Sequence, residues 1–269
     1  MAPASQRRSR SWPSLDRPRA PASCKTEPVR IRYVAFALTV VVLAVSGCSG
    51  SDSTEQQNGT KDTSALTARL TAAQQAITDA PALDISLTTD QLPSGVTGLL
   101  SASGRGYQGA TLADAAFTGD VNVVVGGSTL KAEVVAVDGK VYAKTGLTPI
   151  FLAIDPATLK APDPAGLLGA EGEGLAVILT TTDDLAENGQ SRDGKTVLTS
   201  ISGTIPGSVI SGFLPTADAA STFQVVYRLT EDDTLADATI TGPFYPGAAD
   251  VEYTVVLQPS NDDSEITKP

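Results

Sequence analysis

Cys48 is the residue of this sequence to which a specific chemistry is assigned most directly. Its thiol directly follows the tripeptide VSG and the apolar segment 33–45, and two arginines stand just before that segment. A basic start, a short apolar core and small residues at the break are typical of an export signal. The apolar core is shorter than the about 20 residues that a transmembrane helix needs. We therefore predict that residues 1–47 are a cleaved signal peptide with a long basic n-region.

The junction at Cys48 resembles a bacterial lipobox, in which the thiol becomes a diacylglyceryl thioether and the cysteine becomes the first residue of the mature chain. Val45 is a departure, because leucine is commonest three positions before the cysteine. The resemblance implies a lipid anchor (diacylglycerol and palmitate) at Cys48, on the extracytoplasmic face of the cell membrane. An uncleaved anchor segment with an incidental cysteine is the alternative.

The segment after Cys48 is rich in Ser, Gly, Asp, Thr and Gln and has no apolar periodicity. Such a chain behaves as a flexible coil, and its 13 residues to position 61 have an r.m.s. span of about 20 Å. We therefore assign residues 48–61 to the lipidated cysteine and a tether.

Composition excludes most catalytic classes. The chain has no histidine, and its two cysteines are Cys24, inside the expected signal, and Cys48. Ser-His-Asp and Cys-His catalysis, the usual zinc sites and an internal disulfide framework are therefore unavailable. A Ser-Lys pair is compatible with the composition, but nothing in the sequence brings such a pair together. We expect no enzyme, no cofactor and no metal site.

Charge is distributed very unevenly along the chain. Residues 1–47 hold eight of the 19 basic and two of the 30 acidic residues, which leaves 11 basic and 28 acidic residues beyond them. A body with a formal charge of −17 repels phosphate backbones, so we expect no nucleic-acid partner. It is equally unsuited to a broad basic patch on anionic lipid.

Two further patterns are weaker than they look. Acidic pairs at 183–184, 232–233 and 262–263 lack an EF-hand spacing, and we interpret them as solvated loop charge rather than Ca²⁺ ligands. The glycine-rich segment 166–174 has neither a preceding strand nor a GK[ST] ending, so it predicts a connector and no phosphate loop.

Apolar periodicity predicts one domain over residues 62–259, followed by a polar tail at 260–269. Spacings of four, three and four from Leu66 to Ile77 predict a helix, and segment 205–215 predicts a short one. Between 154 and 190 we expect one or two short helices, the second ended by Asn188-Gly189. A period of two, with Gly-Gly and Asp-Gly turns, predicts about nine strands, among them 83–88, 121–125, 130–136, 141–143, 196–201, 223–229, 236–240 and 251–257.

One-sided alternation favours an antiparallel sheet with one dry face, and short apolar helices need that face to bury themselves. We therefore predict a single α+β domain. The inward positions are mostly Val, Ala and Leu. Such small side chains can leave a dry gap that takes up apolar ligands. They also suit an ordinary packed β core, because Val favours strands in any case.

The order and spacing of several segments resemble the LppX/LprA/LprF/LprG family of mycobacterial and actinobacterial lipoproteins, and within it the LprG branch. These segments are GDVNVVVGGSTLKAEVVAVDGKVYA, IDPATL, DGKTVLTSISGTI and ADATITGPF. The resemblance implies a half-barrel antiparallel sheet with helices over its concave face, which together enclose a hydrophobic cavity. It implies binding of the acyl chains of triacylated glycolipids or phospholipids, which are carried or presented across the cell envelope, with a membrane lipid exporter as a candidate partner.

On that hypothesis one group of residues forms the cavity wall and another its lid or mouth. The wall is assigned to Val121, Val123, Val125, Leu130, Val134, Val225, Tyr227, Tyr253 and Val255. The lid is assigned to Leu167, Leu168, Leu175, Ile178, Val209, Ile210 and Phe213. The alternative is a non-enzymatic surface lipoprotein that acts through protein–protein contacts in envelope assembly. A solute-binding component of an importer is disfavoured, because it would need two α/β lobes.

Overall fold

A computed structural model describes residues 63–170, 174–262 and 264–269 of the chain. The expected signal peptide, Cys48 and the tether lie outside the described residues. The described part contains one antiparallel sheet of eleven strands in the order β6-β5-β4-β3-β2-β1-β11-β10-β9-β8-β7. The strands are β1 (Ala82–Thr88), β2 (Gly98–Tyr107), β3 (Ala116–Val125), β4 (Ser128–Val137), β5 (Lys140–Thr145), β6 (Thr148–Ile154), β7 (Asp183–Asp193), β8 (Thr196–Pro206), β9 (Thr222–Leu229), β10 (Leu235–Gly242) and β11 (Val251–Ser260).

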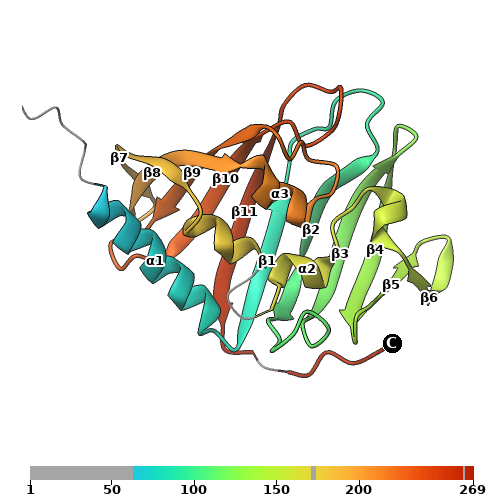
Figure 1. The fold of residues 1–269 in the computed structure, drawn as a ribbon. Helices are drawn as coiled ribbons and strands as arrows, with labels where there is room; N and C mark the ends of the chain where they lie inside the picture. Colours follow the sequence, from blue (N-terminus) through green and yellow to red (C-terminus); the bar gives the residue numbers. More distant parts are fainter. Residues whose placement is uncertain (1–62, 171–173, 263) are drawn as a thin grey trace, which may run out of the picture. The chain divides into compact units, whose positions relative to one another are not determined.

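The sheet consists of two meanders that are joined at its centre. β1 pairs with β11 from Ala82↔Ser260 to Thr88↔Thr254, so the first and last strands of the domain are neighbours. β2 to β6 extend from one side of this pair and β10 to β7 from the other. Figure 1 shows the sheet curving around the helices and remaining open, with β6 and β7 as its edges. We call the helix-covered face the inner face and the opposite one the outer face.

Alternation of side chains decides which face of each strand is buried. In β9, Phe223, Val225, Tyr227 and Leu229 are buried, while the residues between them are exposed or half-buried. The strands are joined by tight turns where the sequence predicts them. Gly126-Gly127 and Asp138-Gly139 both have positive φ at each position, which a two-residue hairpin of matching twist requires.

The helices all lie on the inner face (Figure 1). The first, α1 (Ser64–Thr78), buries Leu70, Ala73 and Ile77, and its Arg69 donates to Asp233 (2.5 Å) and to the Thr230 carbonyl (2.9 Å). The others are η1 (Pro156–Leu159), α2 (Pro164–Leu168), η2 (Gly174–Leu179) and α3 (Gly207–Phe213). None of the helices among the described residues is long and apolar enough to cross a membrane.

The α+β class and the curved antiparallel sheet are confirmed, but the segment around 183–190 was predicted wrongly. Residues Asp183–Asp193 form the edge strand β7 and not the end of a helix. They pair with β8, and Asn188-Gly189 lies in an irregularity of that pairing. A polar edge strand has no dry face and therefore no apolar period of two. The strands β2 and β6 also lack the alternation that predicts a strand, because half of the residues of β2 are Gly or Ser and β6 has five consecutive apolar residues from Ile150 to Ile154.

The end of the chain is attached to the outer face. We expected a polar tail from residue 260, but Ile266 is buried with Val135, Val137 and Tyr142. Arg105 on β2 donates to the carbonyl oxygens of Asp262 (2.7 Å) and Ser264 (2.9 Å). One isoleucine and two main-chain acceptors therefore tie the segment down.

Candidate functional site

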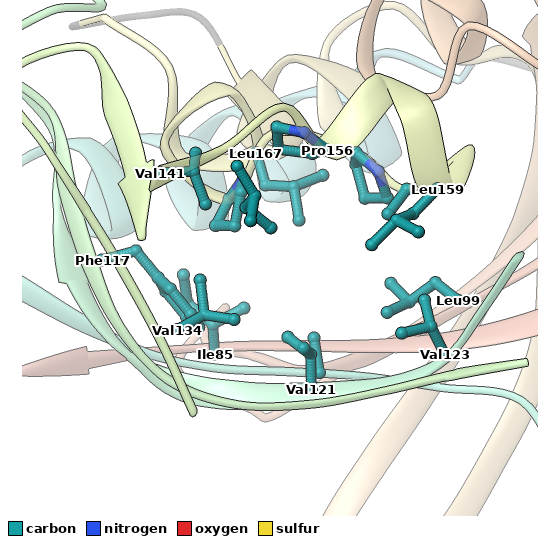
Figure 2. Close-up of a pocket in the computed structure, with 15 residues that line it drawn as sticks. Ile85, Leu99, Phe117, Val121, Val123, Val134, Val141, Pro156, Leu159 and Leu167 are labelled. Atoms are coloured by element: carbon teal, nitrogen blue, oxygen red, sulfur yellow. The ribbon is translucent and has the colours of Figure 1, made fainter. Parts of the chain in front are cut away.

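The inner face carries a dry cavity between the β1–β5 half of the sheet and the segment that follows β6. The volume of this cavity is about 50 Å³. Figure 2 shows Val121, Val123 and Leu99 of the strands below, and Pro156, Leu159 and Leu167 of the covering segment above. Every lining residue is apolar: Ile85, Leu99, Ala102, Phe117, Val121, Val123, Val134, Val141, Ile154, Pro156, Leu159, Ala161, Pro162, Pro164 and Leu167.

The floor of this cavity depends on two glycines. Gly104 and Gly119 are direct partners in the β2–β3 pairing. A Cβ on either would lie 2.7–2.8 Å from Cζ of Phe117, so the ring lies across both glycines. Because no side chain stands there, Phe117 stays low against the sheet and the space above it stays open.

We expect Gly119→Val to lift the Phe117 ring into the cavity. The added side chain would also meet the Ser103 carbonyl oxygen at 2.2 Å, and overpacking of this kind costs about 1–3 kcal/mol. Urea denaturation checks the loss of stability. Gly119→Val/Phe117→Leu is the matched control, since a smaller side chain at 117 should restore part of that loss. No recovery would contradict the assigned contact.

The cover of the cavity is a proline-rich segment, residues 155–168, which contains η1 and α2. Asp155 and Asp163 each accept a hydrogen bond from the amide two residues later, at 3.0 Å, and a proline occupies the first helical turn in both cases. Among the described residues, the hydrogen bonds of 155–167 are made within this segment or to the amide of Gly169, and none of them reaches a strand. The segment is therefore held against the strands by apolar contacts.

The next part of the chain is fixed more firmly. Gln108 donates from Nε2 to the Leu168 carbonyl (3.1 Å), and Gly109 forms a bridge with Ala170. Further on, Tyr227 donates to the Ile178 carbonyl (3.0 Å). The cover is thus loosely held up to residue 167, whereas Leu168 and Ile178 are hydrogen-bonded to Gln108 and Tyr227, and Ala170 forms a bridge with Gly109.

A second dry cavity, with a volume of about 40 Å³, lies beside the first. The two share Leu99, Pro162 and Leu167, so three side chains separate them. The second is lined also by Leu87, Leu175, Ile210, Phe213, Leu214, Ile240, Phe244, Tyr253 and Val255. The two cavities together follow the inner face from β5 to β10.

The structure brings most of the sequence-predicted residues to this interior, although in different roles. Lining residues of the first cavity include Val121, Val123, Val134 and Leu167, and those of the second include Leu167, Leu175, Ile210, Phe213, Tyr253 and Val255. Leu168, Ile178, Val225 and Tyr227 are buried in the same core without lining either cavity, and Val209 and Leu130 are half-buried against it.

Val125 is the clearest exception. It lies next to the β3–β4 turn and is 39% exposed, so it does not form a wall in this structure. Several lining residues were not predicted. Ile85 and Val141 belong to recognised strands and share their inward pattern, so the alternation could have found them. Leu99 lies on the unrecognised strand β2, and the prolines of the cover carry no periodic signal.

Three buried tyrosines supply the few polar groups of the interior. The Tyr227 hydroxyl lies 2.7 Å from Oγ1 of Thr182 and donates to Ile178. The Tyr245 and Tyr253 hydroxyls are 2.8 Å apart, and Tyr253 donates to the Leu99 carbonyl (2.5 Å). Burial raises the pKa of all three hydroxyls, so each stays neutral and hydrogen-bonded.

The arrangement suits uptake of apolar groups and offers little for chemistry. In the described part of the chain no three Asp, Glu or Cys side chains lie close enough to hold a metal ion. The acidic pair at 183–184 begins the strand β7, and Asp184 accepts from Thr204 (3.1 Å). The fold and the cavities define a class of domain: a curved, open antiparallel sheet with short helices over a dry, aliphatic interior.

Comparison with known proteins places the chain within that class. The family model "LppX_LprAFG lipoprotein" matches residues 64–267, and the chain belongs to this family. No curated protein matches it in sequence. The crystal structure of LprF from Mycobacterium bovis is similar, with a TM-score of 0.61 and 15% identity over 77% of this chain and 97% of that one. LppX from Mycobacterium tuberculosis has a TM-score of 0.51 and 15% identity over 76% and 99%.

Proposed function

We propose that this protein binds the acyl chains of membrane lipids in the interior between its sheet and its cover, and carries or presents them across the cell envelope. The observation that carries the proposal is the pair of adjoining cavities whose lining side chains are apolar apart from the hydroxyl of Tyr253. Membership of a lipoprotein family supports a place at the membrane. We assign no catalytic role to the protein.

Physical chemistry gives such a carrier a clear purpose. Each methylene removed from water is worth about 0.8 kcal/mol, so a lipid with two or three long chains cannot cross an aqueous layer unaided. An aliphatic cavity resembles the interior of a bilayer. Transfer between the two is therefore close to neutral, and the chains avoid water throughout.

The cavities in this closed form are too small for a fatty chain, because ligand pockets commonly measure about 300–1,000 Å³. Loading therefore requires the cover to move. Residues 155–167 are the part suited to do so, because none of their hydrogen bonds reaches a strand and only apolar contacts with the sheet must be exchanged. A bound chain would replace those contacts with its own.

The finer assignments rest on the sequence. Cys48 is proposed as the lipidated residue that holds the protein on the extracytoplasmic face of the membrane. Its proposed partners are acylated glycolipids or phospholipids and a membrane lipid exporter. The small closed volume favours the second candidate, a surface lipoprotein that acts through protein contacts in envelope assembly.

Mass spectrometry of the chain extracted from its membrane under gentle conditions separates the two. The carrier is expected to hold about one diacylated or triacylated lipid per folded chain, released by denaturation. A chain free of lipid, which also takes up none when mixed with vesicles of its own membrane lipids, would leave only the protein-contact function.

A further inference from the structure

The β6 edge of the sheet exposes apolar side chains beside the first cavity. Leu147 is 87% exposed, Ile150 63% and Leu152 45%, and all three belong to β6 or to the turn that precedes it. We call these three residues the β6 patch. Figure 1 shows β6 at the open edge of the sheet, next to η1 of the cover.

The β6 patch is continuous with the interior. Leu152 pairs with Ala143, and Ile154, two residues along the same face, pairs with Val141. Ile154 and Val141 both line the first cavity. An apolar path therefore runs from the exposed turn of the β5–β6 hairpin, along the inner side of β6, to the cavity that the loosely held cover closes.

The charge of this region differs from that of the rest of the domain. Residues 116–160 hold four lysines and four acidic residues, whereas the other described residues hold six basic and 18 acidic ones. An anionic phospholipid surface repels the acidic remainder and does not repel this neutral end. The end that can approach a membrane most easily is thus the end that exposes apolar side chains.

The edge is poorly suited to a second copy of the chain. Pairing between β5 and β6 is irregular between Ala143 and Thr145, and Pro149 lies exposed in the same stretch. Proline lacks the amide that an added strand needs, and such irregularities are features that prevent edge-to-edge association. A sheet edge with this form favours a surface without directional hydrogen bonds, which a bilayer provides.

We propose that the β6 patch inserts into the phospholipid bilayer and is the place where an acyl chain passes between the bilayer and the first cavity. The route of the chain rests on the proposed function, whereas the membrane contact does not. The occupant of the patch is phospholipid, and its side chains enter the headgroup region during exchange.

Membrane contact is tested by tryptophan quenching in the full chain. Trp12 lies in the expected signal peptide and no other tryptophan occurs in the sequence, so Leu147→Trp is compared directly with Val226→Trp, an exposed position on the outer side of β9. In vesicles of dibrominated phosphatidylcholine, bromine should quench the fluorescence of a tryptophan at position 147 and leave that of a tryptophan at position 226 unchanged, relative to unbrominated vesicles. Equal loss at both sites overturns the proposal. The proposal is also overturned if the fluorescence of Trp at position 147 changes only with the number of protein chains per vesicle. That result would indicate contact with a second copy of the chain.

Passage of the chain is tested with Leu147→Asp/Ile150→Asp, at the two most exposed positions of the β6 patch. Lipid loading from phosphatidylcholine vesicles should slow by at least about tenfold, because each apolar side chain withdrawn from lipid weakens the contact by roughly that factor. Lipid content at equilibrium should stay unchanged. Unchanged loading in a chain that does hold lipid overturns the route alone, whereas failure of the wild-type chain to hold lipid overturns the proposed function.

Discussion

Replacement of Val123 by tryptophan is expected to remove bound lipid from the folded protein. Val123 is 3% exposed, and its side chain points into the first cavity from β3 (Figure 2). An indole at this position fills the cavity, whose volume is about 50 Å³. It therefore occupies the space that an acyl chain would need when the cover moves. Loss of contact with only two methylenes costs about 1.6 kcal/mol, which lowers affinity more than tenfold.

The measurement is lipid per folded chain by mass spectrometry, together with urea denaturation to show that the variant folds. Overpacking should lower the free energy of unfolding by about 1–3 kcal/mol and leave most of the chain folded. Val226→Trp on the outer side of β9 is the matched control, and it should keep its lipid. A folded Val123→Trp protein that retains the same lipid would show that acyl chains bind elsewhere.

The inner wall could be predicted because its signal is local. In β3, β9 and β11 every second residue is apolar, and each of these strands has one buried face. Val121, Val123, Val134, Tyr253 and Val255 therefore lie where alternation placed them. Val125 continues the same alternation but is exposed at the end of β3, next to the β3–β4 turn. Alternation assigns a face of the sheet and gives no information on how far the cover extends.

The cover could not be predicted in the same way. Its position depends on Pro156, Pro162 and Pro164, which contact strand residues far away in sequence and have no period. The Phe117 ring across Gly104 and Gly119 is equally invisible to a single-sequence pattern, since it depends on the register between β2 and β3. Whether small side chains leave a cavity or close it is decided by such contacts between distant segments.

Stability should fall steeply above pH 10, because of the three buried tyrosines. Tyr227, Tyr245 and Tyr253 are at most 3% exposed, and burial raises the pKa of each above the ordinary value of about 10. Above pH 10 the unfolded chain releases these protons while the folded chain retains them. The unfolded state then binds fewer protons, so the free energy of unfolding decreases as the pH rises.

Each tyrosine contributes up to about 1.4 kcal/mol per pH unit, and the three together up to about 4 kcal/mol per unit. Below pH 9 they should contribute almost no pH dependence. Urea denaturation at a series of pH values from 8 to 12 measures the slope. Since domains of this kind are stable by about 5–15 kcal/mol, a loss of up to about 4 kcal/mol per unit should remove most of that stability within a few pH units above 10.

Tyr227→Phe distinguishes this cause from general charge repulsion at high pH. The variant loses the hydrogen bonds to Thr182 and Ile178, so its stability at pH 8 should be lower by about 1–3 kcal/mol. Its slope above pH 10 should nevertheless be shallower by up to about 1.4 kcal/mol per unit, because one proton fewer is released. A slope equal to that of the wild type would mean that Tyr227 ionises as easily in the folded chain as in the unfolded one. The bond to Ile178 would then not be the firm attachment that lets the cover open at residues 155–167 while η2 stays in place.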